Sequence, residues 1–206
     1  MYKAFIKKLE KSLKQELPGE KAQYKMAPLF RDKFPESFDK AKLSSVLILL
    51  FPDNGKLNLI LIKRPEYKGY HSGQISFPGG KFEKSDNNLI NTALREAYEE
   101  IGINSEKIKI IGTISNLFIP VSNMMVLPVV GYTTETPELF PNKNEVETIL
   151  KVKLDDLMNH LNQSFFNINF NAHNIKAPCY KVNGHNIWGA TAMILSEFLE
   201  IISKVK

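Results

Sequence analysis

A short acidic segment carries the residues of this chain that could do chemistry together. Glu96, Glu99 and Glu100 lie within five positions of one another, directly after Arg95. Residues three and four apart are neighbours on a helix, so a helical segment would bring the three carboxylates close together. Their mutual repulsion must be offset, and a divalent cation with oxygen ligands would do so. Arg95, four residues before Glu99, can pair with one acid and hold the cluster in place.

The surrounding sequence contains the elements needed to position this segment. Residues 88–101 predict a helix that ends at Gly102. A short strand over 73–77 precedes Pro78-Gly79-Gly80, where glycine lets the backbone approach a metal or a phosphate closely. An acidic pair on a helix indicates by itself only a solvated face, but the strand, the Gly-Gly turn and the Arg-Glu pair together favour a metal site. The helix has a narrow apolar stripe that can pack against a sheet, made of Ile90, Leu94, Ala97 and Ile101.

The segment from Gly80 to Ile103 resembles the Nudix box. In that box, Gly is followed after five residues by an acid, and later by Arg-Glu, an aliphatic residue, any residue, Glu-Glu, any residue, Gly and an aliphatic residue. Residues 95–103 fit this pattern, with Ala97 at the aliphatic position. The chain departs from the box at its first acid, which is Asp86 instead of Glu and is separated from Arg95 by eight residues instead of seven. The same departures are familiar in the coenzyme A pyrophosphatase branch of the family.

Two further segments resemble that branch. Residues 61–80 resemble its coenzyme A motif, and residues 186–195 resemble its Ile-Trp-Gly-x-Thr-Ala segment. The upstream fit is incomplete and lacks an Arg of the branch, although Lys68 could replace its phosphate contact. The basic residues nearest to this motif are Arg64, Lys63 and Lys68. The positions that depart from it are Lys63, Pro65 and Gly69.

The resemblance implies a Nudix fold, an α/β (α+β) architecture in which a mixed β-sheet is sandwiched between helices. It also implies Mg²⁺ or Mn²⁺ as the cofactor, which would polarise the pyrophosphate and activate water. The implied metal ligands are Glu96, Glu99, Glu100 and the carbonyl of Gly79. The candidates for contact with substrate are Arg64, Lys68, His71 and Gly80. The candidates for catalysis are Glu99, Glu100, Glu145 and Arg95.

Four residue assignments leave alternatives open. The general base could be Glu99, Glu100 or Glu145, since Nudix enzymes vary in this role. Glu145 is preferred to Glu147 as the acid brought from the loop after Pro141-Asn142, although either could be an exposed loop residue. His71 could touch a phosphate or move a proton, but a structural role at the strand turn is favoured. For Trp188, core packing is favoured over stacking on an adenine.

The resemblance implies hydrolysis of the pyrophosphate bond of coenzyme A or its derivatives, which gives 3′,5′-ADP and 4′-phosphopantetheine. A Nudix pyrophosphatase for ADP-ribose, dinucleotides or nucleoside triphosphates is the first alternative. A non-catalytic nucleotide-binding Nudix module is the second. The intact Arg95-Glu96 and Glu99-Glu100 pairs argue against this module, because binding alone does not require the carboxylates.

Length and composition set the remaining expectations. The chain has 206 residues, is 43% hydrophobic and has no linker or repeat, so one domain over 1–206 is expected, with an N-terminal helix and extension over 1–40. The net charge of +5 suits a small nucleotide substrate, but the basic residues are scattered, so no nucleic-acid partner is expected. No apolar run is long enough for a membrane span. The single Cys179 fits a cytoplasmic protein, and a homodimer is left open.

Hydrophobic periodicity predicts the other elements. The expected strands are 45–51, 57–63, 108–114, 125–132, 147–152, 165–170 and 180–182. The expected helices are 2–17, 154–161 and 190–205.

Overall fold

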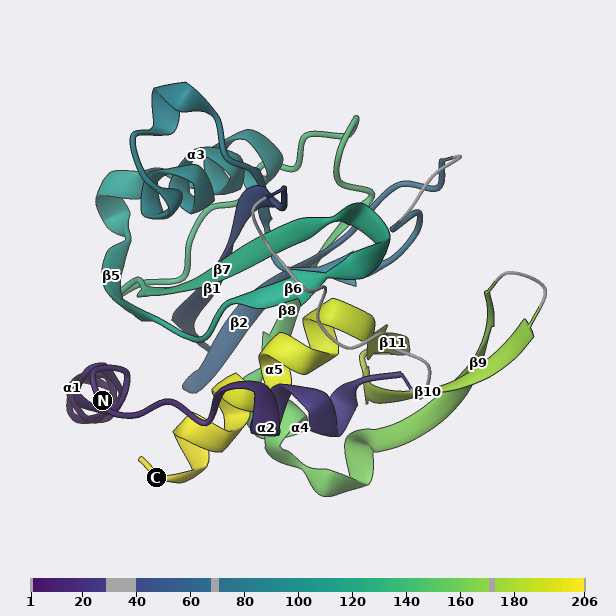
Figure 1. Cartoon of the computed structure of the whole chain (residues 1–206). Coiled ribbons are helices and arrows are strands. Elements are labelled where there is room, and N and C mark those ends of the chain that lie inside the picture. Colours follow the sequence, from purple (N-terminus) through teal and green to yellow (C-terminus); the bar gives the residue numbers. More distant parts are fainter. Residues whose placement is uncertain (1, 29–39, 68–70, 171–172, 206) are drawn as a thin grey trace.

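The computed structural model describes residues 2–28, 40–67, 71–170 and 173–205, with the backbone alone at 169, 170 and 173–175. A mixed eight-stranded sheet forms the middle layer, with the order β3-β2-β1-β7-β5 (Figure 1). In addition, β4 pairs with β1, β6 with β7 and β8 with β2; β1 and β7 are parallel, and the other pairs are antiparallel. The strands are β1 (Lys42–Asp53), β2 (Lys56–Lys63), β3 (Ile75–Ser76), β4 (Gly79–Lys81), β5 (Lys109–Thr113), β6 (Leu117–Ile119), β7 (Met124–Tyr132) and β8 (Thr148–Lys153).

Helices cover both faces of this sheet, with α3 on one side and α5 on the other (Figure 1). The α-helices are α1 (Lys3–Ser12), α2 (Gly19–Gln23), α3 (Leu89–Ile101), α4 (Leu154–Met158) and α5 (Gly189–Ser203). Short 3₁₀-helices are η1 (Tyr24–Met26), η2 (Lys84–Asp86), η3 (Ser105–Lys107), η4 (Pro120–Ser122) and η5 (His160–Asn162). The expected α/β fold, a mixed sheet sandwiched between helices, is therefore confirmed. Among the described residues, no helix combines the length and apolarity that crossing a bilayer requires.

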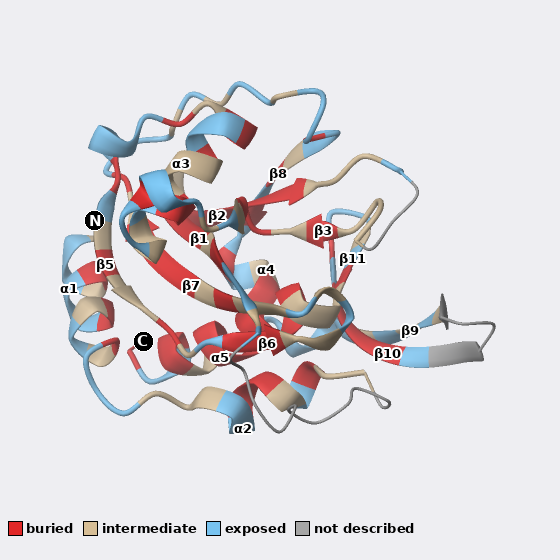
Figure 2. Cartoon of the chain, turned by 45° about the horizontal axis from the view of Figure 1, so that its top comes forward, coloured by how far each residue is buried: buried red, intermediate tan, exposed pale blue. Residues whose placement is uncertain are grey.

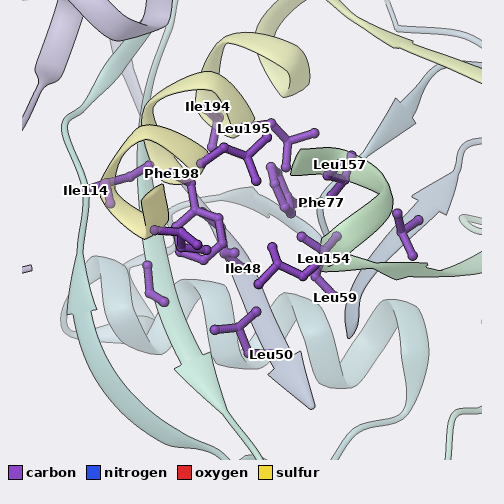
Figure 3. Close-up of a cluster of buried hydrophobic side chains, with 14 of the residues drawn as sticks. Ile48, Leu50, Leu59, Phe77, Ile114, Leu154, Leu157, Ile194, Leu195 and Phe198 are labelled. Carbon is purple, nitrogen blue, oxygen red and sulfur yellow. The ribbon is translucent and has the colours of Figure 1, made fainter. Parts of the chain in front are cut away.

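Strand β1 shows why both faces need a covering layer. Successive side chains of a strand point to opposite faces of the sheet. Ile48 and Leu50 belong to the core cluster that includes α5, which Figure 3 shows in close-up. Leu47, Leu49 and Phe51 belong to the cluster that includes α3. All five side chains are fully buried, as the colouring of the central strands in Figure 2 illustrates. An apolar run without alternation thus produces a three-layer arrangement.

A second, three-stranded antiparallel sheet has the order β11-β10-β9 and extends away from the main body (Figure 1). Its strands are β9 (Gln163–Phe170), β10 (His173–Val182) and β11 (His185–Trp188). The strand expected over 165–170 is confirmed as β9. The strand expected over 180–182 is only the end of a longer β10, because the polar residues in its first half carry no apolar pattern. Trp188 is only partly buried and meets Phe166 of β9 edge-on at 5.7 Å between ring centroids, so it packs against the neighbouring sheet strand and not in the buried core favoured for it.

Buried polar groups connect the N-terminal part of the chain to α5. Glu197 of α5 is 0% exposed, and its carboxylate accepts hydrogen bonds from the backbone of Gly19 (3.1 Å), the amide of Gln23 (2.8 Å) and the backbone of Ser115 (3.3 Å). A buried carboxylate is tolerated when donors satisfy it in this way. Gly19 and Gln23, from the part of the chain without a recognised motif, therefore help to hold α5 in place. The first residues of α5 line the cavity described below.

The helix α3 follows its sequence signals closely. Asn88 caps its start by accepting a hydrogen bond from the Asn91 backbone at 2.9 Å, and Gly102 ends it with a φ of +69°. The predicted helix over 2–17 is shorter, because α1 ends at Ser12 and the chain turns before Pro18.

Candidate active site

A cavity of about 520 Å³ lies where β1, β3, β4, α3, the β6–β7 hairpin and the start of α5 meet. Its volume is within the range of small-molecule sites. We call its charged part the charged end, which consists of Arg64, Lys81, Glu83, Glu96, Glu100 and Glu145. We call the part contributed by β3, the β6–β7 hairpin and α5 the uncharged wall, which consists of residues 75–77, Ile119, Ser122, Met124, Val126, Ala190, Thr191 and Ile194.

Glu100 is the most deeply buried carboxylate of the charged end. It is 1% exposed, and its Oε2 accepts a hydrogen bond from the Gly79 backbone N–H at 2.8 Å. Its Oε1 lies 3.8 Å from Nη1 of Arg64. Burial raises the pKa of Glu100 to about 7, although the Gly79 hydrogen bond and Arg64 act against this rise. The charges of Glu96 and Glu145 raise it further, so the three carboxylates face a shared space.

The two glycines before the acidic helix are constrained for different reasons. Gly79 has a φ of +152°, and a Cβ there would overlap the Ser45 carbonyl oxygen and the Val46 backbone of β1. Gly80 is not among the residues with positive φ. A Cβ on Gly80 would instead overlap the carboxylate of Glu96. Glycine at position 80 is therefore required for the close approach to Glu96 and not for a positive φ.

Arg95 holds the acids of this region in a fixed arrangement. Its Nε donates to Asp86 Oδ1 at 2.7 Å, and its Nη1 donates to Glu99 Oε2 at 2.7 Å. Its Nη2 donates to the Lys81 carbonyl at 2.9 Å and lies 3.0 Å from Oε1 of Glu96. The hydrogen bond from Arg95 lowers the pKa of Asp86 to about 2, against the effect of burial. Arg95 is thus placed to position acids more than to touch a ligand.

Comparison with known proteins decides the family. The NUDIX domain model matches residues 41–172. The chain belongs to the Nudix family. It is 28% identical over 181 residues to Nudix hydrolase 3 of Caenorhabditis elegans, a match that covers 80% of this chain and 75% of that protein. It is 38% identical over 136 residues to mitochondrial Nudix hydrolase 15 of Arabidopsis thaliana, covering 65% of this chain but only 46% of the relative.

Solved structures show the same fold. The Nudix hydrolase RenU of Mycobacterium smegmatis has a TM-score of 0.58 at 14% identity, covering 88% of this chain and 95% of that one. At that identity the likeness concerns the fold alone. Nudix hydrolases generally use divalent metal ions, so the residues of this Nudix hydrolase can be tested for their fit to one.

Of the three glutamates on the helix of the Nudix box, two line the cavity, Glu96 and Glu100. Glu96 has 15% of its side chain exposed, and burial raises its pKa. Glu99 has 48% of its side chain exposed, is paired with Arg95 and does not line the cavity. In the described part of the chain, no three acidic, His or Cys side chains form a group that could hold a metal ion by themselves. Mg²⁺, however, typically takes one or two carboxylates together with water and substrate phosphate oxygens. Glu96 and Glu100, two desolvated carboxylates, fit a cation that shares its ligands with substrate.

The structure explains why the first acid of the box can be Asp86 instead of Glu. Asp86 is 4% exposed and accepts two hydrogen bonds from Arg95, while its Oδ2 also accepts from Thr92 and from the Glu83 backbone. The shorter side chain sits at the end of the 3₁₀-helix η2, where it is close enough to reach the guanidinium. Asp86 is therefore part of the support of the acidic helix.

The other residues expected at the site divide into those at the cavity and those elsewhere. Arg64, His71 and Glu145 line the cavity. His71 has a φ of +67°, and its Nδ1 lies 3.1 Å from Oε1 of Gln74, which fits the favoured structural role. Lys68 lies outside the described residues. Glu147 pairs with Lys63 at 2.6 Å and does not line the cavity.

Sequence reasoning did not identify the uncharged wall. Its apolar members from the β6–β7 hairpin, Ile119, Met124 and Val126, have the same residue types as the core, so nothing in the sequence distinguishes them. Ile187, which belongs to the segment that resembles the coenzyme A branch, is 1% exposed and does not line the cavity. Thr191 of the same segment does line it, and its hydroxyl donates to the Ile75 carbonyl at 2.9 Å.

Proposed function

We propose that this Nudix hydrolase cleaves the pyrophosphate bond of coenzyme A or its derivatives, releasing 3′,5′-ADP and 4′-phosphopantetheine. The observation that carries the proposal is the division of one cavity into a charged end and an uncharged, mainly aliphatic wall. Coenzyme A has the matching division, since its pyrophosphate is joined to an uncharged pantetheine arm. The resemblance of residues 61–80 and 186–195 to the coenzyme A branch supports the same substrate.

The residues of the charged end have complementary roles in this proposal. A Mg²⁺ or Mn²⁺ ion at Glu96 and Glu100 would neutralise the pyrophosphate and polarise its P–O bonds. Arg64, beside Glu100, donates hydrogen bonds to a phosphate oxygen. Glu145 accepts the proton of the attacking water, because it lines the cavity and forms no ion pair within the described residues. Arg95 keeps Glu96 in place through its fixed contacts.

Glu99 is the least favoured of the three candidates for the general base. Its carboxylate is engaged by Arg95 at 2.7 Å and lies outside the cavity. Glu100 is occupied by the Gly79 N–H and is assigned to the metal. These two engagements leave Glu145 as the base. The carbonyl of Gly79 remains a further predicted metal ligand.

A panel of pyrophosphates tests the proposal against its alternatives. The full-length chain is incubated with Mg²⁺ or Mn²⁺ and coenzyme A, ADP-ribose, a dinucleotide or ATP, and the products are identified by liquid chromatography and mass spectrometry. We expect the highest kcat/KM for coenzyme A, with equimolar 3′,5′-ADP and 4′-phosphopantetheine. A higher kcat/KM for ADP-ribose or a dinucleotide would assign the chain to the other Nudix pyrophosphatases. The absence of any product across the panel would favour the non-catalytic module. A cytoplasmic location and a single domain stay predictions, and a homodimer stays open.

A further inference from the structure

Some polar atoms at the cavity lack a partner in the protein. Among the described residues, three buried side-chain atoms form no hydrogen bond: Nε of Arg64, Oγ of Ser76 and Oγ of Ser122. All three residues line the cavity. Buried polar groups are almost always hydrogen-bonded, because leaving one unpaired costs free energy. Their common location therefore indicates that a ligand of the cavity supplies the missing partners.

The two serines belong to the uncharged wall. Ser76 is in β3, and Ser122 ends η4 in the β6–β7 hairpin. The charged residues of the cavity come from other elements: the end of β2, β4 and the residues after it, α3, and the loop before β8. Within its described residues, the wall thus offers aliphatic surface and two free hydroxyls, without a charged side chain.

This combination selects among ligand chemistries. A second phosphate would meet no cation on the wall. A second base on the wall would need a ring to stack on, but Phe77 is 1% exposed, and the exposed ring of Tyr67 lines the cavity from the loop after β2, outside the wall. A purely aliphatic chain would leave both hydroxyls unpaired. An aliphatic arm with amide groups satisfies each requirement, because amides can pair with hydroxyls and the methylene groups can pack on Ile119 and Met124.

We infer that the uncharged wall is a subsite for an amide-bearing aliphatic arm, whose amides are recognised by the hydroxyls of Ser76 and Ser122. Identifying this arm as pantetheine, which carries two amides, rests on the proposed function. Binding of the arm can nevertheless be measured separately from hydrolysis.

The two expected products allow a direct test, since 4′-phosphopantetheine has the arm and 3′,5′-ADP lacks it. Their inhibition constants are measured for the wild-type chain and for a Ser76→Ala/Ser122→Ala double variant. We expect the inhibition constant of 4′-phosphopantetheine to rise about tenfold, the effect of losing two hydrogen bonds between neutral groups, and that of 3′,5′-ADP to stay within about twofold. The unfolding midpoint should not fall, because neither hydroxyl has a partner in the described protein. A merely structural role of the serines would lower it.

Ser44 provides a matched control at the same cavity. Its hydroxyl donates to the Met125 carbonyl at 3.2 Å. Ser44→Ala should therefore lower the unfolding midpoint and leave the ratio of the two inhibition constants unchanged. Equal changes of both constants in the double variant, or no change in either, would overturn the inference while leaving coenzyme A hydrolysis intact.

If coenzyme A is not hydrolysed, the proposed function fails and the subsite is tested by calorimetric titration of 4′-phosphopantetheine. Binding that is about tenfold weaker in the double variant would support the subsite. Absence of binding to the wild-type chain, or equal binding to both proteins, would refute it.

Discussion

Replacing Asp86 by Asn tests the electrostatic support beneath the acidic helix. Hydrogen bonding to Arg95 lowers the pKa of the Asp86 carboxyl from 3.8 to about 2, opposed by burial and assisted by the Glu83 backbone and Thr92. A folded-state pKa below the unfolded value stabilises the folded protein above about pH 4, and this contribution is lost as the pH falls through about 2. The shift corresponds to roughly 2–3 kcal/mol of unfolding free energy at neutral pH. Asn keeps the shape of the side chain but removes the charge.

Urea unfolding of the metal-free protein measures this contribution. At pH 7 we expect Asp86→Asn to lower the free energy of unfolding by roughly 2–3 kcal/mol, and we expect the difference to shrink between about pH 4 and pH 2.5. Glu10→Gln is the control, because Glu10 forms an exposed i,i+4 pair with Lys14 at 3.3 Å, a kind of pair that contributes about 0.5 kcal/mol or less. A loss of the same size at pH 7 and pH 3, or no larger than in the control, would refute the electrostatic explanation.

Three further substitutions probe the charged end. Glu100→Gln should lower turnover by about a hundredfold or more, because it removes a charged metal ligand. The metal-free variant should unfold no more easily at pH 8, because burial raises the pKa of Glu100 to about 7 and makes its charge costly there. Near-normal kinetics would show that Glu100 is not part of the metal site. Gly80→Ala should lower kcat/KM by about tenfold or more, because the added Cβ overlaps the Glu96 carboxylate; wild-type kinetics would show that this contact can relax. Arg64→Ala should lower kcat/KM by about tenfold to a hundredfold for both coenzyme A and 3′-dephospho-coenzyme A, because its guanidinium lies 3.8 Å from Glu100. A loss confined to coenzyme A would place Arg64 at the 3′-phosphate instead.

The sequence predicts the acidic helix well because its signals are local. Asn88 and Gly102 mark its two ends within the segment itself, and the apolar stripe gives its orientation. The pairing of β4 with β1 could not be predicted in the same way. It joins Gly79 to Val46, which are distant in the chain, and a Gly-Gly pair indicates a turn when read alone.

In the candidate site, too, local spacing could be predicted, whereas contacts between distant segments could not. The spacing of Arg95, Glu96 and Glu100 predicts that their side chains gather, and the structure brings Glu96 and Glu100 to one cavity. The i,i+4 spacing of Arg95 and Glu99 predicts that they pair, but it could not show that Glu99 lies outside the cavity. The wall residues Ile119 and Met124 were not predictable, because they have the pattern of core residues and reach the cavity only through the folding of the β6–β7 hairpin.

The attachment of Gly79 has a consequence for how this protein could acquire new substrates. Its N–H donates to Glu100, and β1 leaves no room for a side chain at position 79, so the proposed metal site is attached to the centre of the sheet. Within the described residues, the side chains of Ser122 and Met124 form no hydrogen bond or ion pair with Glu96 or Glu100, so we expect substitutions there to leave both acids in place. Substitutions in this one hairpin, whether natural or engineered, can therefore change the substrate specificity while the acidic residues of the site stay the same.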